Sequence, residues 1–183
     1  MQASGDFCQG IFTRGWLTGH GFMVQKLHVV YTGQMKRNQP HGIGKETLLG
    51  GSVYEGAFRR GKRHGQGRLH KPQAFTYSGA FAAGVFEGEG HCVWVSGNSY
   101  QGEWSSGNMN GPGTFTWKNG NQYVGQFVNG YKHGTGRIQY ADGRVYDGEW
   151  QADHPHGTGR VAAEASDPGR LSVWRRGRRL EWA

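Results

Sequence analysis

The chain has 183 residues, of which 34 are glycine and 13% are aromatic, and its formal net charge is +8. This length fits one domain, and glycine without a collagen period argues for strands and tight turns rather than a triple helix or disorder. No apolar run is long enough to form a membrane-spanning helix.

The charge is unevenly distributed along the chain. Residues 1–76 carry a net charge of +8, residues 77–169 carry −4, and residues 170–183 carry +4. The charge of such blocks bears on which partners the surface could bind and not on the fold. Drift between solvated faces explains the pattern about as well as a binding function does.

A pattern of 23 residues recurs from near the start of the chain. Counting the opening residue as position one, positions three, twelve and fourteen are glycine in every copy, and position five is large and apolar. Position eight is Gly, Asn or Asp, residues that tolerate a positive φ, which predicts a left-handed turn there. A fixed period in this range indicates a repeat array. The openings are Cys8, Tyr31, Tyr54, Tyr77, Tyr100, Tyr123 and Tyr146.

Each copy alternates in the manner of two short strands. Tyr100 and Trp104 fall on one side of a first strand, and Phe115 falls on the same side of a second. Asn119-Gly120 then favours a tight turn into the next copy. The sequence therefore predicts an all-β fold, a single-layer antiparallel β-meander or solenoid of consecutive 23-residue hairpins, with about fourteen strands in the seven copies.

The phase of the pattern predicts the boundaries. Residues 1–7 form a lead-in, and residues 8–169 hold the seven repeats. After Val161 the phase slips by one residue, so that residues 170–183 form a degenerate eighth repeat or basic C-terminal cap. The arginines of this tail could either prevent other strands from pairing with the edge of the sheet or form a binding patch.

The repeat Y-x-G-x-W-x-x-G-x-x-x-G-x-G resembles the MORN (membrane occupation and recognition nexus) repeat over residues 8 to about 163. The resemblance implies a MORN-only protein, a structural scaffold that binds a protein partner through its repeat sheet. Related proteins are often found in cilia, flagella and membrane-associated cytoskeleton. We therefore expect a cytoplasmic, cytoskeleton-associated protein, in a cilium, flagellum or axoneme among other assemblies. Cys8 and Cys92 fall at core positions about three repeats, ~29 Å, apart, which is too far for a disulfide and fits a reducing compartment.

No enzyme, cofactor or metal site is predicted. Four histidines precede the glycine at position twelve, but each lies at least about one repeat, ~10 Å, from the next, whereas zinc ligands lie ~2 Å from one point. Gly56 to Lys62 imitates a phosphate loop, but Arg63 stands where that motif needs Ser or Thr. The four histidines are His41, His64, His133 and His156.

Two groups of residues are candidates for binding. Aromatic residues on the apolar face could clamp a peptide or helix, although they must also form the core. The groove set is Tyr54, Phe58, Tyr77, Phe81, Tyr100, Trp104, Tyr123, Phe127, Tyr146 and Trp150. The basic set, suited to an acidic partner such as tubulin, is Lys36, Arg37, Arg59, Arg60, Lys62, Arg63, Arg175, Arg176, Arg178 and Arg179.

The basic set leaves other partners open. Acidic phospholipid, such as phosphoinositide, is the alternative, because basic residues near an anionic surface contribute ~1 kcal/mol each. The basic and acidic stretches could also pair two copies of the chain as an antiparallel homodimer. Nucleic acid is not expected, because aromatic and basic residues do not alternate on one exposed face.

Overall fold

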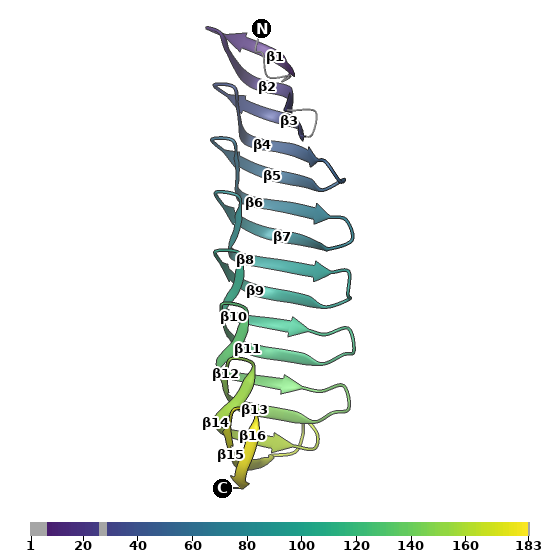
Figure 1. The fold of residues 1–183 in the computed structure, drawn as a ribbon, viewed down its shortest axis with the longest axis vertical. Helices are drawn as coiled ribbons and strands as arrows, with labels where there is room; N and C mark the ends of the chain where they lie inside the picture. Colours follow the sequence, from purple (N-terminus) through teal and green to yellow (C-terminus); the bar gives the residue numbers. More distant parts are fainter. Residues whose placement is uncertain (1–6, 26–28, 183) are drawn as a thin grey trace. The chain divides into compact units, whose positions relative to one another are not determined.

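A computed structural model describes residues 7–25 and 29–182, and within that part every regular element is a β-strand (Figure 1). The predicted lead-in lies outside the described residues except for Phe7. The strands are β1 (Phe7–Thr13), β2 (Trp16–Gln25), β3 (Val29–Lys36), β4 (Gln39–Leu48), β5 (Val53–Arg59), β6 (Lys62–Lys71), β7 (Phe75–Ala82), β8 (Val85–Trp94), β9 (Ser99–Ser105), β10 (Asn108–Thr116), β11 (Gln122–Val128), β12 (Tyr131–Gln139), β13 (Val145–Gln151), β14 (His154–Ala162), β15 (Arg170–Arg175) and β16 (Arg178–Trp182).

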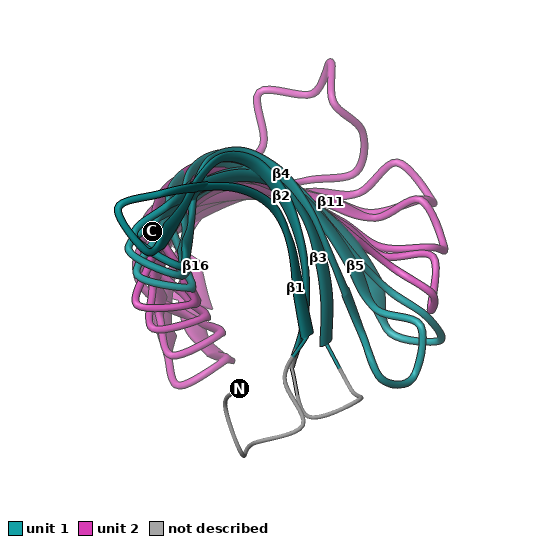
Figure 2. Cartoon of the chain, turned by 90° about the horizontal axis from the view of Figure 1, so that it is seen from above, with its two compact units in different colours: residues 1–88 teal, residues 89–183 magenta. Residues whose placement is uncertain are grey.

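The strands are hydrogen-bonded in chain order, from β1 to β16, in one open antiparallel sheet. The predicted meander of hairpins is thus confirmed, and β15 and β16 add a further hairpin beyond the seven predicted repeats. The chain divides into two compact units, residues 1–88 (unit 1) and residues 89–183 (unit 2), which are coloured separately in Figure 2. In each unit the strands bend strongly along their length.

The hairpin turns are built from two successive residues with positive φ. In the second repeat these are Arg37 at 52° and Asn38 at 63°. Position eight has a positive φ in all seven repeats, as predicted. Position seven has one too, although Arg, Ala, Ser and Asn occupy it, which gives the primed turns that match the twist of paired strands.

A backbone hydrogen bond ties each of several turns to the hairpin before it. The N–H of Gly61, at position eight, donates to the carbonyl of Pro40, position ten of the preceding repeat, at 2.9 Å. In unit 2, Gly130 donates in the same way to Met109 at 2.8 Å. These links hold successive turns at a fixed spacing.

The core is a row of tyrosines that lie over paired glycines. Tyr54 covers Gly56 and Gly67, which face each other across β5 and β6, and its hydroxyl donates to the carbonyl of Ala57 at 2.9 Å. A Cβ on Gly56 would lie 2.6 Å from Oη of Tyr54, so only glycine leaves room for the ring. The same hydroxyl contact recurs in Tyr31, Tyr77, Tyr100, Tyr123 and Tyr146.

Edge-to-face ring contacts connect these tyrosines along each unit. In unit 1, Tyr54 touches Phe58 of its own repeat, with ring centroids 5.1 Å apart, and Phe81 of the next at 5.0 Å. In unit 2 the same alternation ends with Tyr146 against Trp174 at 5.4 Å. Such pairs stabilise beyond the area they bury, by about 0.5–1.5 kcal/mol each.

The opposite face of the sheet carries alternating charges. Glu55 pairs in register with Lys45 on one side and with Arg68 on the other. Nζ of Lys45 lies 2.7 Å from a carboxylate oxygen of Glu55. Opposite charges therefore face each other across neighbouring strands. Because both side chains are largely exposed, they fix the register more than they stabilise the fold.

Of the two cysteines expected in the core, Cys92 is buried but Cys8, in the first hairpin, is half-exposed, and no disulfide joins the two. Burial raises the pKa of the Cys92 thiol to about 11, which makes it a poor nucleophile. In the described part of the chain, no helix is long and apolar enough to cross a membrane.

Candidate functional site

The ten aromatic residues predicted to line a binding groove lie in the core instead. Each is at most 5% exposed, and the four tyrosines of repeats three to six are fully buried. The reason is a second layer of side chains, contributed by position ten of the same hairpin. Phe86 stacks on Tyr77 at 3.8 Å, and the guanidinium of Arg63 lies 5.1 Å from the ring centre of Tyr54. These rings therefore hold the fold together and are not open to a partner.

A different aromatic row is partly exposed in unit 2. Trp94, Trp117 and Tyr140 stand at position eighteen of successive repeats. Nζ of Lys132 lies 5.4 Å from the centre of the Trp117 ring and 4.7 Å from that of the buried Trp150, so a cation contacts one member of this row. Burial lowers the pKa of Lys132, and Asp153 opposes that shift. The sequence marked these residues only by their common interval.

The basic residues of unit 1 gather at its hairpin turns. Positions six and nine flank the turn and position seven lies in it, so their side chains project from the end of each hairpin. All members are exposed. We call the set the cationic turn surface: Arg14, Lys36, Arg37, Arg59, Arg60 and Lys62. Sequence reasoning missed Arg14, which could have been found because Arg14, Arg37 and Arg60 all occupy position seven.

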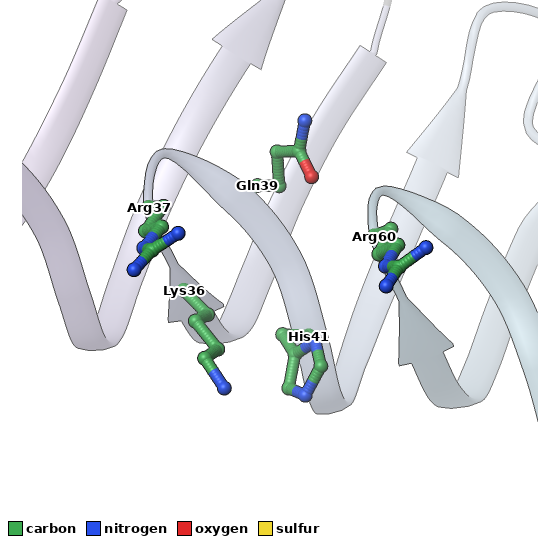
Figure 3. Close-up of a pocket in the computed structure, with 5 residues that line it drawn as sticks. All are labelled: Lys36, Arg37, Gln39, His41 and Arg60. Carbon is green, nitrogen blue, oxygen red and sulfur yellow. The ribbon is translucent and has the colours of Figure 1, made fainter.

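Two depressions lie side by side along these turns. One, of about 350 Å³, is lined by Lys36, Arg37, Gln39, His41 and Arg60. Figure 3 shows Arg37 and Arg60 on successive turns, with Lys36 and His41 at the same end of their hairpin.

The other depression, of about 470 Å³, is lined by Thr13, Arg14, Trp16, Thr18, Lys36 and Arg37. It is built from the same repeat positions as the depression lined by His41 and Arg60, but one repeat earlier in the chain. Lys36 and Arg37 therefore belong to both.

The charge of this surface is not neutralised within the described part of the chain. No carboxylate there forms an ion pair with Arg14, Lys36, Arg37 or Arg60. In unit 1, Glu55 pairs with Lys45, and Glu46 pairs with Arg63. Oriented cations without counter-charges attract an anionic ligand.

Arg63 does not belong to this surface, contrary to its place in the predicted basic set. Its guanidinium makes two hydrogen bonds to one oxygen of Glu46, at 2.6 and 2.8 Å. The side chain is 16% exposed and covers the Tyr54 ring. Position ten points over the core, whereas positions six, seven and nine point outward, and this separates Arg63 from its neighbours in sequence.

The C-terminal arginines of the predicted set form a separate group in unit 2. All four are exposed in the last hairpin, β15 and β16. The guanidinium of Arg179 lies 3.9 Å from the centre of the Trp182 ring. The group covers the final strand of the sheet, where charge discourages further strand pairing.

The described residues contain no group of three or more His, Cys, Asp or Glu side chains arranged to hold a metal ion. The histidines at position eleven are at least one repeat apart in the chain, and His41 lines a depression whose other residues are cations and Gln39. Lys36, Arg37 and Arg60 give this depression a positive charge.

The MORN repeat model matches six segments, residues 31–53, 54–73, 77–99, 100–122, 123–143 and 146–160. The chain belongs to the MORN repeat family. The first hairpin and the last, β15 and β16, lie outside the matched segments of this MORN repeat protein. That they are a first and a degenerate eighth repeat stays a prediction.

Among solved structures, the MORN repeat chain is similar to the SAS-4 (dCPAP) TCP domain of Drosophila melanogaster, determined in complex with a Proline Rich Motif of Ana2 (dSTIL). The TM-score is 0.52 at 10% sequence identity, and the match covers 96% of this chain and 94% of that one. At this identity the likeness shows the fold alone. No curated protein matches the chain in sequence.

Proposed function

We propose that this MORN repeat protein is a non-enzymatic scaffold that binds an acidic segment of a protein partner through its cationic turn surface. One observation carries the proposal. Arg14, Lys36, Arg37 and Arg60 line two adjacent depressions at the hairpin turns and have no carboxylate partner in the described residues. Electrostatic complementarity of this kind favours fast and specific association.

The comparisons support a binding role in general. The MORN repeat is a non-enzymatic type of repeat, and the similar SAS-4 domain was solved with a peptide motif bound. Repeat arrays present extended surfaces of equivalent positions, which suit extended partners. We place the scaffold in a cytoskeletal or ciliary assembly, where acidic protein surfaces such as that of tubulin are abundant.

The experiment reverses two charges and measures co-sedimentation with microtubules. The full chain is expected to pellet with microtubules at low salt and to be released as salt rises, because screening shortens the reach of exposed charges. The variant Arg37→Glu/Arg60→Glu should stay in the supernatant. Lys71→Glu/Lys118→Glu, which makes the same change of net charge at exposed lysines outside the cationic turn surface, should pellet like the natural chain.

The same variants distinguish the alternative partner. If the natural chain floats with vesicles of acidic phospholipid and ignores microtubules, the lipid function replaces the protein-binding one. If Arg37→Glu/Arg60→Glu pellets as well as the natural chain, the turn surface is not the binding site. Pairing of two copies through basic and acidic stretches predicts a dimer in sedimentation at low salt and a monomer at high salt.

A further inference from the structure

The two depressions of the cationic turn surface are equivalent subsites. We call the depression lined by Arg14 and Trp16 the first subsite and the one lined by His41 and Arg60 the second. The first is formed by positions six, seven, nine and eleven of one repeat with the turn of the next, and the second repeats this arrangement one repeat later. Arg14 and Arg37 flank the first, and Arg37 and Arg60 flank the second. Arg37 therefore serves both subsites, whereas Arg14 and Arg60 each serve one.

The distance between the subsites is set by the sheet. One repeat contributes two strands, so successive turns are about 9.6 Å apart at the usual strand spacing. The bond from the Gly61 N–H to the carbonyl of Pro40 holds neighbouring turns at that distance. The primed turn geometry, with φ of about 50° at each of Arg14, Arg37 and Arg60, gives the three side chains the same direction of departure.

A ligand that fills both subsites needs anionic groups at the same spacing. In a polyproline II segment, every third residue falls on one side, and three residues rise about 9.3 Å. In a β-strand, residues two apart share a side but rise only about 6.8 Å. An extended acidic segment in the polyproline II conformation is thus matched to the repeat, and a β-strand is not.

The two subsites differ at one position, and this difference would determine which end of a bound peptide lies in which subsite. The first contains Trp16, which is 50% exposed, where the second has Gln39. The equivalent residue of the third repeat is Lys62. An apolar or proline residue next to the acid in the first subsite would pack on the Trp16 ring, whereas the second subsite offers polar contacts.

We propose that the cationic turn surface selects an extended acidic peptide with a carboxylate at every third residue, one carboxylate in each subsite. The inference rests on the proposed function and specifies the partner segment. Recessed subsites at a fixed interval suit side chains on one chain better than the laterally mobile headgroups of a membrane. The charge excess of unit 1 alone would not distinguish one acidic sequence from another.

The test compares three labelled peptides of equal length and equal net charge by fluorescence anisotropy with the full chain. In the first, Glu occurs at every third position with Pro between. In the second, the same Glu residues are clustered at one end, and in the third they alternate with Thr in a β-favouring pattern. The first is expected to bind at least about fivefold more tightly than the others, because only it pairs with both subsites.

Single substitutions then test the subsites. Arg14→Gln and Arg60→Gln should each weaken the first peptide about two- to fivefold, and Arg37→Gln about four- to twenty-fivefold, as expected for exposed ion pairs in one and two subsites. Lys71→Gln, which removes an exposed charge outside the cationic turn surface, should have no effect. Trp16→Ala should weaken only peptides with an apolar residue beside the Glu.

Failure of this inference differs from failure of the proposed function. Equal binding of all three peptides, still weakened by Arg37→Gln, overturns the spacing rule and leaves an acidic protein partner in place. No binding of any peptide, with Arg37-dependent flotation on phosphatidylserine vesicles, overturns both. Binding of the first peptide that ignores Arg37→Gln also overturns the assignment, because another surface would then hold the ligand.

Discussion

Asn38 is joined to Leu17 by two hydrogen bonds that run in opposite directions. The Asn38 N–H donates to the Leu17 carbonyl at 3.1 Å, and the Leu17 N–H donates to Oδ1 of Asn38 at 2.6 Å. The residue that permits a φ of 63° thus also ties its turn to the hairpin before it. Asp153 makes the equivalent pair of contacts with Lys132 in unit 2.

Removing the side-chain half of this link should loosen the first hairpin. Asn38→Gly keeps the positive φ but leaves the Leu17 N–H without its acceptor, so we expect the free energy of unfolding to fall by about 0.5–1.5 kcal/mol. Urea unfolding followed by circular dichroism measures the change. Asn38→Asp retains the acceptor and should match the natural chain. An unchanged unfolding midpoint for Asn38→Gly would show that the bond contributes nothing.

The glycine beneath each tyrosine ring should tolerate no side chain. In Gly67→Ala, the added Cβ would meet the hydroxyl and ring of Tyr54, and the backbone or ring must shift, so we expect a loss of about 1–3 kcal/mol or more. Gly50→Ala is the control, since it strains a φ of 86° without any contact within 4 Å. Thermal unfolding should rank Gly67→Ala as the more damaging change. The reverse ranking would contradict the steric account.

The tyrosine row predicts a loss of stability at high pH. Burial raises the pKa of Tyr31, Tyr54 and Tyr146 to about 12, from an ordinary value near 10. The folded chain therefore holds these protons more tightly than the unfolded chain does. Their contribution is fully present below about pH 10 and is lost as the pH rises from 10 through 12.

Phenolate absorbance and unfolding by urea, both measured from pH 9 to 12, test this. The free energy of unfolding should be level near pH 9 and decline steeply above pH 10. Phenolate should appear from the buried Tyr31, Tyr54 and Tyr146 of the native chain well above the ordinary tyrosine pKa. Native titration of all tyrosines near pH 10 would refute the burial effect.

The Arg63–Glu46 pair should contribute more than the exposed pairs do. Arg63→Met leaves the carboxylate of Glu46, which is only 19% exposed, without its donors, and we expect a loss of about 1–3 kcal/mol. Lys45→Met, at an exposed pair, should change stability little. The double variant Arg63→Met/Glu46→Gln should recover part of the loss, because no unpaired charge remains. Equal losses for the single and double variants would count against this explanation.

The sequence predicted the fold because its signals are local and repeated. The glycines, the tyrosines and the residue at position eight indicate the local backbone geometry directly. Because they recur at a fixed interval, each has the same environment in every repeat. The positive φ predicted at position eight is confirmed for that reason. The positive φ at position seven could not be predicted, since residues such as Arg37 and Ala83 are not typical of the left-handed conformation.

The candidate site was predicted less well because the exposure of a side chain depends on whether a second layer of side chains covers it. Alternation placed Tyr54 on the apolar face, but only the bend of the strand brings Arg63 over the ring. Sequence neighbours such as Lys62 and Arg63 consequently point to different surfaces, one to solvent and the other to the core. Lys36, Arg37 and Arg60 were predicted as basic candidates, and the structure brings them together in one depression.

The bond between position eight of one repeat and position ten of the repeat before it has a consequence for how such genes change length. Each hairpin presents the same donor on one side and the same acceptor on the other, as the Gly61–Pro40 and Gly84–Arg63 bonds show. An in-frame duplication of residues 31–53 would insert a hairpin that bonds to both neighbours through this same donor and acceptor, so no new kind of contact is needed. It would also add one Lys-Arg pair to the turns, so that the reach of the cationic surface can grow by whole repeats.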